Sequence, residues 1–143
     1  MEVIISEKKE KVLVTIECPA ITPDIQKLKD HILTYEGRIW ASQGTGKVQI
    51  PLRDILYFES VDNKTFLYTI KQVLEIPQRL YELENSLKDQ GFFICSKSVI
   101  VNLKQIQSLQ PELNRSILAA MNGGDRITIS RRYVKALLEI LSL

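Results

Sequence analysis

The stretch FFICSKSVIVNL (residues 92–103) indicates the fold of this chain more clearly than any other. Two short apolar runs flank the polar triplet Ser96, Lys97 and Ser98. Both runs are rich in aromatic and β-branched residues, which favour buried strands. The triplet cannot stay in a core without polar partners, so we expect it at the surface as a loop or bulge. A lysine between two hydroxyl groups on a tight turn suits a phosphate group or a base edge.

Length and composition are those of an ordinary folded protein. The chain has 143 residues, of which 45% are hydrophobic and 25% are charged. This is enough for one well-packed core, or for one domain with a small appendage. No apolar run approaches the roughly 18–20 residues of a membrane span, and the N-terminus lacks the pattern of a signal peptide. We therefore expect a cytoplasmic protein without membrane insertion.

Positive charge is concentrated in the last third of the sequence. Residues 1–91 contain 12 basic and 14 acidic residues, whereas residues 92–143 contain seven basic and three acidic ones. The second part is therefore basic, although the whole chain has a formal net charge of only +2. Such an asymmetry points weakly to an anionic partner, because proteins without such a partner also show it.

The residues that usually carry catalysis or bind metals are few and scattered. Cys18 and Cys95 lie far apart at the ends of strand-like runs, where buried reduced thiols are expected. The single histidine, His31, falls within a helical pattern, so a zinc site lacks a ligand set. Acidic pairs such as Glu82 and Glu84 fall on a predicted helix, where solvation explains them. We therefore predict no enzyme activity, no metal or cofactor, and no small-molecule substrate.

The first 37 residues are predicted to form a small ββα unit. Val3–Ile5 and Val12–Cys18 are β-branched runs separated by a charged stretch, as in a hairpin. Thr22 and the proline after it begin a helix, and Gly37 ends it. A unit of this size is too small to fold alone. We expect it to pack on the remainder of the chain or to dimerise with a second copy.

Residues 38–143 are predicted to form a second domain of closely spaced antiparallel strands with two helices. Pro77 opens the internal helix, and a C-terminal helix begins near Arg131 behind the N-cap Ser130. The expected fold is therefore mainly β (α+β) and not a βαβ arrangement. Turn signals separate the short apolar segments at residues 42–46, 62–64 and 122–125.

Three polar, partly basic sites interrupt or end these apolar segments. If all three lie along one edge of the β assembly, they form a basic stripe suited to DNA. Cations would follow the phosphates, and short hydroxyl and amide groups would reach base edges. The last site stands at a helix start, where the helix dipole disfavours cations. Its arginines either have a function outside the helix or extend their side chains along its surface. The sites are Asn63, Lys64 and Thr65; Ser96, Lys97 and Ser98; and Ser130, Arg131 and Arg132.

Several motifs resemble the LytTR DNA-binding domain in order and spacing. The resemblance covers about residues 44–143, and the combination is specific although each piece is weak. The chain resembles the group in which this domain stands alone behind a short N-terminal segment, without a receiver domain. The matching pieces are Leu56–Ser60, Leu80–Glu84, Phe92–Phe93, Ser96–Ser98, Val101–Leu103, Ile106, Met121–Gly123 and Ser130–Tyr133.

The resemblance implies an elongated, mostly antiparallel β fold that inserts loops, instead of a recognition helix, into successive major grooves. Members of the family typically bind direct repeats of a short motif as dimers and bend the DNA. The implied partners are therefore double-stranded DNA and a second copy of the chain. The implied DNA-contacting positions are the loop around Lys64 and Thr65, the triplet at Ser96 and Lys97, and Arg132.

The central triplet departs from the family pattern. Many relatives have Arg-x-His-Arg-Ser where this chain has ICSKS at residues 94–98. Lysine is a point charge without the bidentate fork that arginine offers to guanine. We therefore expect Lys97 to supply phosphate affinity, and Arg132 with the Lys64 loop to supply sequence choice. The alternatives are a protein-interaction or dimerisation module that has lost specific DNA binding, and a ligand-sensing role for residues 1–37, for which no pocket signature is present.

Overall fold

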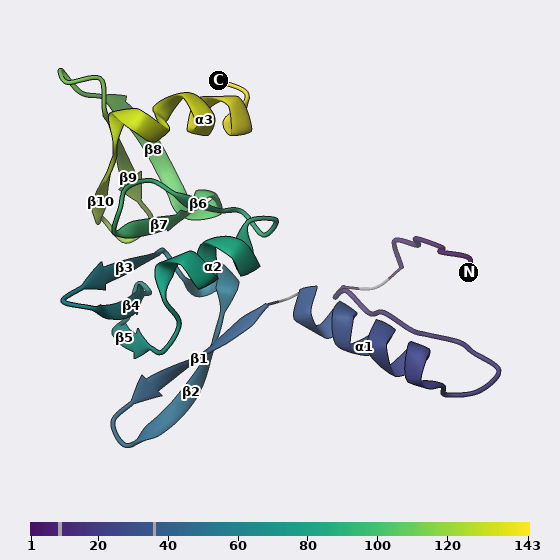
Figure 1. Cartoon of the computed structure of the whole chain (residues 1–143). Helices are drawn as coiled ribbons and strands as arrows, with labels where there is room; N and C mark the ends of the chain where they lie inside the picture. Colours follow the sequence, from purple (N-terminus) through teal and green to yellow (C-terminus); the bar gives the residue numbers. More distant parts are fainter. Residues whose placement is uncertain (9, 36) are drawn as a thin grey trace. The chain divides into compact units, whose positions relative to one another are not determined.

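The computed structural model describes residues 1–8, 10–35 and 37–143. The chain contains two compact units, Met1–Tyr35 and Glu36–Leu143. The helices are α1 (Pro23–Tyr35), α2 (Leu80–Leu87) and α3 (Arg131–Leu141), with the short 3₁₀ turns η1 (Leu52–Asp54) and η2 (Leu103–Gln105). The strands, labelled in Figure 1, are β1 (Arg38–Gln43), β2 (Gly46–Pro51), β3 (Tyr57–Val61), β4 (Lys64–Tyr68), β5 (Val73–Ile76), β6 (Phe92–Ile94), β7 (Val99–Asn102), β8 (Ile106–Pro111), β9 (Ile117–Met121) and β10 (Arg126–Ile129).

In the first unit the predicted helix forms but the predicted hairpin does not. Thr22 is the N-cap of α1, because its Oγ1 accepts a hydrogen bond from the amide of Ile25 at 3.3 Å. Residues 1–8 and 10–22 contain no helix or strand, so the ββα prediction with strands at Val3–Ile5 and Val12–Cys18 is wrong. Most of their apolar side chains are exposed. A lone two-stranded hairpin is marginal in water, and residues 1–8 and 10–35 contain no strand that could support one.

The second unit is built from antiparallel sheets. β1 and β2 form a two-stranded hairpin, and β10, β9 and β8 form a three-stranded sheet in that order. Between them in sequence lies a five-stranded sheet with the order β5-β4-β3-β7-β6. With α2 inside the unit and α3 at its C-terminus, this architecture confirms the predicted mainly β (α+β) fold.

The five-stranded sheet is buried on both faces. Phe58 and Ile100 belong to a core that α2 and the β1–β2 hairpin complete. Their neighbours in sequence, Tyr57 and Val101, belong to a second core with β9, β10 and α3. Side chains alternate between the faces of a strand, so neighbouring residues of β3 and of β7 contribute to different cores. Burial on both sides explains why β6 and β7 appear in the sequence as nearly continuous apolar runs. In Figure 1, α3 and the three-stranded sheet lie on one side of β7, and α2 lies on the other.

The buried Asn102 fastens the strand ends to the 3₁₀ turns. Its side chain is only 2% exposed. Its Nδ2 donates to the carbonyl oxygens of Ile55 at 2.9 Å and Leu52 at 3.4 Å, and its Oδ1 accepts from the amide of Lys104 at 3.1 Å. These partners satisfy a polar side chain that could not otherwise be buried. Asn102 therefore serves the fold.

Two stacked tyrosines connect the five-stranded sheet to the turn between β9 and β10. The rings of Tyr57 and Tyr68 stack with their centroids 4.2 Å apart. The Tyr57 hydroxyl donates to Asp125 Oδ2 at 3.0 Å, and the Tyr68 hydroxyl donates to Glu59 Oε1 at 2.8 Å. Burial, with the hydrogen bond to Glu59, raises the pKa of Tyr68 to about 12. Burial and the bond to Asp125 raise the pKa of Tyr57 still further.

Both helix starts in the second unit differ in detail from the prediction. α2 begins three residues after Pro77, because Arg79 is still extended with φ −82° and ψ 158°. Arg79 is the N-cap, and its amide donates to Glu82 Oε1 at 3.4 Å. Ser130 is the N-cap of α3 as predicted, but its hydroxyl makes no capping hydrogen bond.

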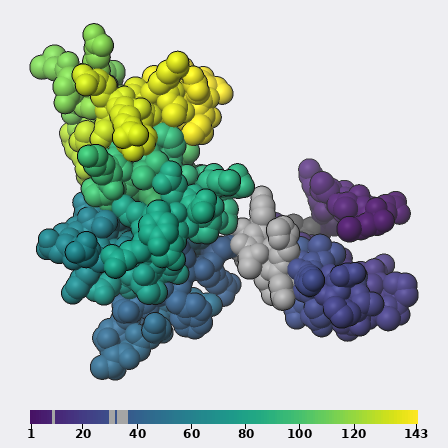
Figure 2. All heavy atoms as spheres, in the orientation of Figure 1, coloured from purple at the N-terminus to yellow at the C-terminus, as the bar shows by residue number. Residues whose placement is uncertain are grey.

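Several large apolar side chains of the second unit are exposed to solvent. Trp40 is 55% exposed and Tyr81 is 71% exposed. In Figure 2 the β1–β2 hairpin (blue) and the β8–β9 connection (light green) project from this unit. Single exposed apolar residues are normal on a protein surface. Over the described ranges, no helix combines the length and the apolar character needed to cross a membrane.

Candidate functional site

Strand pairing brings two of the three predicted sites to one end of the five-stranded sheet. β3 pairs with β4 as far as Val61 and Lys64, and the pairing of β3 with β7 ends at Glu59 and Val99. The β3–β4 turn and the triplet 96–98 therefore leave the sheet at the same end. The amide of Ser60 donates to the carbonyl oxygen of Ser98 at 2.8 Å, which ties the triplet to β3.

The third site is hydrogen-bonded to the second. The amide of Ser130 donates to the carbonyl oxygen of Cys95 at 2.8 Å, so the start of α3 lies directly against the loop between β6 and β7. In Figure 1 the β3–β4 turn and the start of α3 lie on the same side of the second unit, at the left. We use the name basic edge for the surface residues of these three segments: Asn63, Lys64, Ser96, Lys97, Ser98, Arg131 and Arg132.

Lys97 is the most accessible residue of the central triplet. It is exposed, whereas Ser96 and Ser98 are half-buried. The Ser96 Oγ accepts a hydrogen bond from the amide of Ser98 at 3.3 Å. This local bond folds the triplet into a turn with the lysine at its tip. The expectation that the triplet reaches the surface as a loop is thereby confirmed.

Thr65 does not belong to the basic edge. Its side chain is only 3% exposed, and it pairs with Ile76 across the β4–β5 ladder. Because successive side chains of a strand point to opposite faces, the exposed Lys64 is followed by an inward-facing Thr65. The assignment of Thr65 as a DNA-contacting residue is corrected by this burial, and the residue contributes to packing instead.

The four cations of the basic edge have different surroundings. Lys64 Nζ lies 4.0 Å from Glu75 Oε1, and both side chains are largely exposed. The Arg132 guanidinium lies 5.6 Å from the centre of the Tyr133 ring, a distance that allows a cation–π interaction. The Tyr133 ring packs edge-on against Phe93 at 6.4 Å. Arg132 is therefore held by the core of the domain, whereas Lys97 is not paired with any carboxylate in the described part of the chain.

Arg79 also lies at this end of the sheet, although no sequence pattern pointed to it. Its Nη1 donates to the carbonyl oxygen of Asn63 at 2.8 Å. The prediction placed Arg79 inside a helix opened by Pro77, where a solvated arginine is unremarkable. The available signal was its position three residues before Glu82, which makes it an N-cap of unusual residue type.

Neither cysteine chemistry nor metal binding is indicated beside the basic edge. Cys95 is fully buried, and its Sγ donates to the carbonyl oxygen of Val99 at 3.5 Å. Burial raises the pKa of the Cys95 thiol to about 12, so it stays protonated and unreactive at neutral pH. Among the side chains that the structure describes, no group of three His, Cys, Asp or Glu residues could hold a metal ion.

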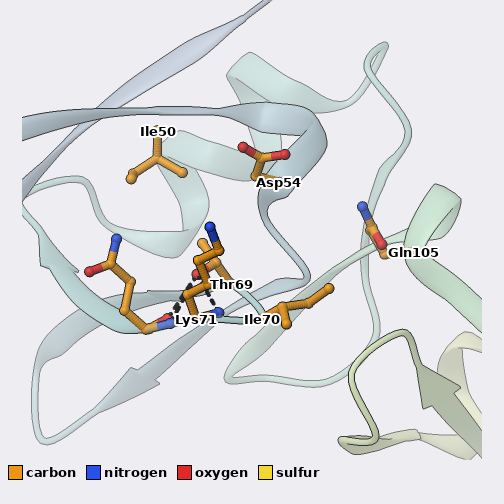
Figure 3. Close-up of a pocket in the computed structure, with 7 residues that line it drawn as sticks. Ile50, Asp54, Thr69, Ile70, Lys71 and Gln105 are labelled. Atoms are coloured by element: carbon orange, nitrogen blue, oxygen red, sulfur yellow. Dashed lines mark hydrogen bonds between the residues drawn. The ribbon is translucent and has the colours of Figure 1, made fainter.

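A shallow pocket of about 310 Å³ lies at the opposite end of the five-stranded sheet. Its lining comes from β2, η1, the β4–β5 turn and η2, and Figure 3 shows these side chains. The Thr69 hydroxyl is already engaged within the turn, since it accepts from the amides of Lys71 and Gln72 at 3.2 and 3.1 Å. The pocket therefore offers solvated polar groups without a convergent ligand set. The lining residues are Ile50, Asp54, Thr69, Ile70, Lys71, Gln72 and Gln105.

Comparison with known protein families identifies the family to which this domain is similar. The family model described as the LytTr DNA-binding domain matches residues 46–142. The chain belongs to this family. The segments of the basic edge all fall within the matched range, whereas α1 and the residues before it fall outside.

Two bacterial proteins that match this chain are longer than it is. The transcriptional regulatory protein YpdB of Escherichia coli K12 is 30% identical over 94 residues, which cover 65% of this chain and 38% of that protein. The sensory transduction protein LytT of Bacillus subtilis is 25% identical over 123 residues, which cover 86% of this chain and 51% of that protein. The matched region therefore spans about half or less of these relatives.

A solved structure has the same fold. It is the LytTr DNA-binding domain of a methyl-accepting/DNA response regulator from Bacillus cereus. It superposes with a TM-score of 0.70 at 24% sequence identity, covering 74% of this chain and 97% of that domain. At this identity the likeness establishes the architecture of the LytTR domain, and the roles of individual side chains have to be argued from this chain itself.

Proposed function

We propose that this protein regulates transcription by binding double-stranded DNA through the basic edge. The observation that carries the proposal is the backbone hydrogen bonding that joins the Lys97 loop to β3, which leads into the Asn63–Lys64 turn, and to the start of α3. The Ser60–Ser98 and Ser130–Cys95 bonds, both 2.8 Å, hold the segments in one array. Because these loops are already ordered, little conformational entropy is lost when such an array binds a phosphate backbone. Membership of the LytTR DNA-binding domain family supports DNA as the partner.

Contact with the major groove would be made by loops and by the first residues of α3. The groove is about 12 Å wide and admits protein elements of this size. Exposed Lys97 stands at the tip of its turn, where a compact cation suits a phosphate. Arg132 has the planar fork that recognises guanine, and its contact with Tyr133 limits the positions it can take. We assign backbone affinity to Lys97, and sequence choice to Arg132 with Asn63 and Lys64.

We further propose that the protein acts as a homodimer on direct repeats, in the cytoplasm where bacterial DNA lies. The support is the apolar surface of the first unit. Val3 and Ile4 are each 79% exposed, and Val12 and Leu13 are 91% and 65% exposed. Contiguous exposed apolar residues of high β propensity indicate a surface that another chain covers. A second copy supplies the strand partners that one copy lacks.

The DNA proposal is tested by a charge-matched pair of double variants. Lys97→Ala with Arg132→Ala removes two cations from the basic edge. Arg53→Ala with Lys104→Ala removes two exposed cations from η1 and η2, at the opposite end of the five-stranded sheet. Affinity for a mixed-sequence duplex of about 30 base pairs, measured at about 50 mM salt, should fall at least tenfold in the first variant only.

The same experiment separates DNA binding from a protein-interaction role. An interaction module would bind the duplex weakly, and both double variants would behave alike. Selection of bound fragments from a random duplex library then tests the finer proposal. We expect two copies of a short motif in the same orientation, spaced by about one helical turn. An inverted repeat or a single site would overturn the direct-repeat arrangement while leaving DNA binding intact.

Dimerisation is tested in the full chain by sedimentation equilibrium. Val12→Asp with Val14→Asp places charges on the exposed apolar run of the first unit. We expect the wild type to sediment as a dimer and this variant as a monomer, with the second unit still folded by circular dichroism. A dimer of unchanged stability in the variant would show that the first unit is not the interface.

A further inference from the structure

Arg79 contacts the turn that carries two residues of the basic edge. Its Nη1 donates to the carbonyl oxygen of Asn63 at 2.8 Å, across 16 positions of sequence. Asp62 and Asn63 both adopt left-handed backbone conformations, with φ of 51° and 62°. Two such residues between the paired Val61 and Lys64 form a tight hairpin turn. The carbonyl of Asn63 lies outside the β3–β4 ladder, and the guanidinium satisfies it.

Arg79 occupies the N-cap of α2, a position that does not favour arginine unless its side chain has a contact outside the helix. Arg79 is the N-cap of the helix, where Ser, Thr, Asp and Asn are favoured because their side chains accept from free amides. Arginine has no acceptor, and its charge faces the positive end of the helix dipole. The Arg79 side chain makes no capping hydrogen bond, and the only side-chain acceptor at this helix start among the described residues is Glu82, which accepts from the Arg79 amide. The arginine is therefore explained by its contact with the turn and not by the helix.

The strand order places Arg79 beside the basic edge, at the flank away from Lys97. β5 runs antiparallel to β4 with Thr65 opposite Ile76, so the chain leaves β5 at the end where the β3–β4 turn lies. β7 and the Lys97 loop adjoin the other side of β3. Within the described residues no carboxylate lies within 4.0 Å of the Arg79 guanidinium, whereas Lys64 has Glu75 at that distance.

We propose that Arg79 is a positioning residue for the β3–β4 turn and an additional contact to the DNA backbone. One guanidinium N–H holds the carbonyl of Asn63, and the remaining N–H groups are available for a phosphate oxygen. A guanidinium can serve both acceptors at once because its donors diverge in a fixed plane. The backbone-contact part rests on the proposed DNA binding, whereas the positioning part concerns the protein alone.

Two substitutions separate the roles of Arg79. Arg79→Ser removes the guanidinium and supplies a favoured N-cap, so the melting temperature should hold or rise. Arg79→Lys keeps the charge but loses the planar set of guanidinium donors.

We expect Arg79→Ser to bind the mixed-sequence duplex about three- to tenfold more weakly than the wild type, with the slope of log K against log salt shallower by about 0.9. Arg79→Lys should retain the slope. Arg53→Ser, an exposed arginine at the opposite end of the sheet, is the matched control and should bind as the wild type does.

Positioning is measured without DNA by the amide resonances of Asp62, Asn63 and Lys64. Both Arg79 variants should shift these resonances and increase their fast backbone motion, and Arg53→Ser should not. Unchanged resonances in both variants overturn the positioning role. If the wild type binds DNA and Arg79→Ser binds it equally well, the backbone contact is overturned and the proposed function stands. A wild type that binds no duplex at low salt overturns the proposed function and the backbone contact together, and the resonances still decide the positioning role.

Discussion

The amide of Ser130 donates a 2.8 Å hydrogen bond to the carbonyl oxygen of Cys95, and this bond joins the first turn of α3 to the Lys97 loop. The two segments adjoin strands of different sheets, β10 and β6, and the bonded residues are separated by 35 positions of sequence, yet they meet at the basic edge. The bond is made by backbone atoms, so side-chain chemistry in the sequence could not reveal it. It makes the spacing between Lys97 and Arg132 a property of the fold.

Replacing Ser130 by proline removes this hydrogen bond selectively. Ser130 has φ −61°, close to the value that proline imposes, so the principal change is the loss of the N–H donor. We expect the free energy of unfolding to fall by about 0.5–1.5 kcal/mol and duplex affinity to fall several-fold. Ser130→Ala keeps the amide and loses a hydroxyl that makes no capping bond, so it should resemble the wild type. Equal urea midpoints and equal affinities for both variants would contradict the coupling.

Neutralising Glu75 should strengthen DNA binding. Its Oε1 lies 4.0 Å from Lys64 Nζ, and the carboxylate both competes for the lysine and repels phosphates. Exposed pairs are worth only about 0.2–1 kcal/mol, so Glu75→Gln should tighten binding about two- to fivefold at low salt. Asp54→Asn is the matched control, because it neutralises a carboxylate paired with Arg53 at the other end of the sheet. Fluorescence anisotropy with a labelled duplex gives both affinities, and weaker binding by Glu75→Gln would refute the prediction.

The Tyr57–Asp125 hydrogen bond should contribute to stability without contributing to DNA binding. It connects the five-stranded sheet to the β9–β10 turn over 3.0 Å and is partly buried. Tyr57→Phe should lower the free energy of unfolding by about 0.5–1.5 kcal/mol, because it removes a hydrogen bond, and water solvates the exposed Asp125 carboxylate in the variant. Tyr81→Phe, at a largely exposed tyrosine, should change it by less than about 0.5 kcal/mol. Urea titrations would refute the role if the two variants were equally stable.

Stability should fall steeply in alkaline solution. Burial raises the pKa of Cys95 and Tyr68 to about 12, from ordinary values of 9.0 and 10.0. Below the ordinary values these groups are protonated in both states, so their contribution is complete. Between the ordinary and the raised values the unfolded chain loses protons that the folded chain keeps, and unfolding is favoured. Urea titrations from pH 9 to 12 should show this fall, and Tyr68→Phe should make it shallower. An unchanged pH dependence in that variant would contradict the assignment.

The architecture of the second unit could be predicted because its signals are local. The turn after Met121 contains Gly123 and Gly124, which adopt φ of 91° and 100°, so turn chemistry marks the hairpin directly. The apolar runs of β6 and β7 indicated buried strands, and the structure places both runs in strands. The hairpin at Val3–Ile5 and Val12–Cys18 failed for the opposite reason. Residues of high β propensity form strands where neighbouring strands cover them, and the described residues of the first unit include no such strand.

The candidate site was predicted only in outline. The residue types at 63–65, 96–98 and 130–132 marked the segments, but the inward orientation of Thr65 depends on strand register, where one position exchanges the two faces. Arg79 was missed because its contact with Asn63 is tertiary. Sequence patterns thus located the loops, and only the folded chain determined which of their side chains reach the surface.

The salt dependence of duplex affinity tests the central claim most directly. If the basic edge makes about six phosphate contacts, log K should fall against log salt with a slope near −5 in the wild type. Lys97→Ala with Arg132→Ala should make that slope shallower by about 2, whereas Arg53→Ala with Lys104→Ala should leave it unchanged. Equal slopes in all three proteins, or no binding at low salt, would contradict DNA recognition by the basic edge.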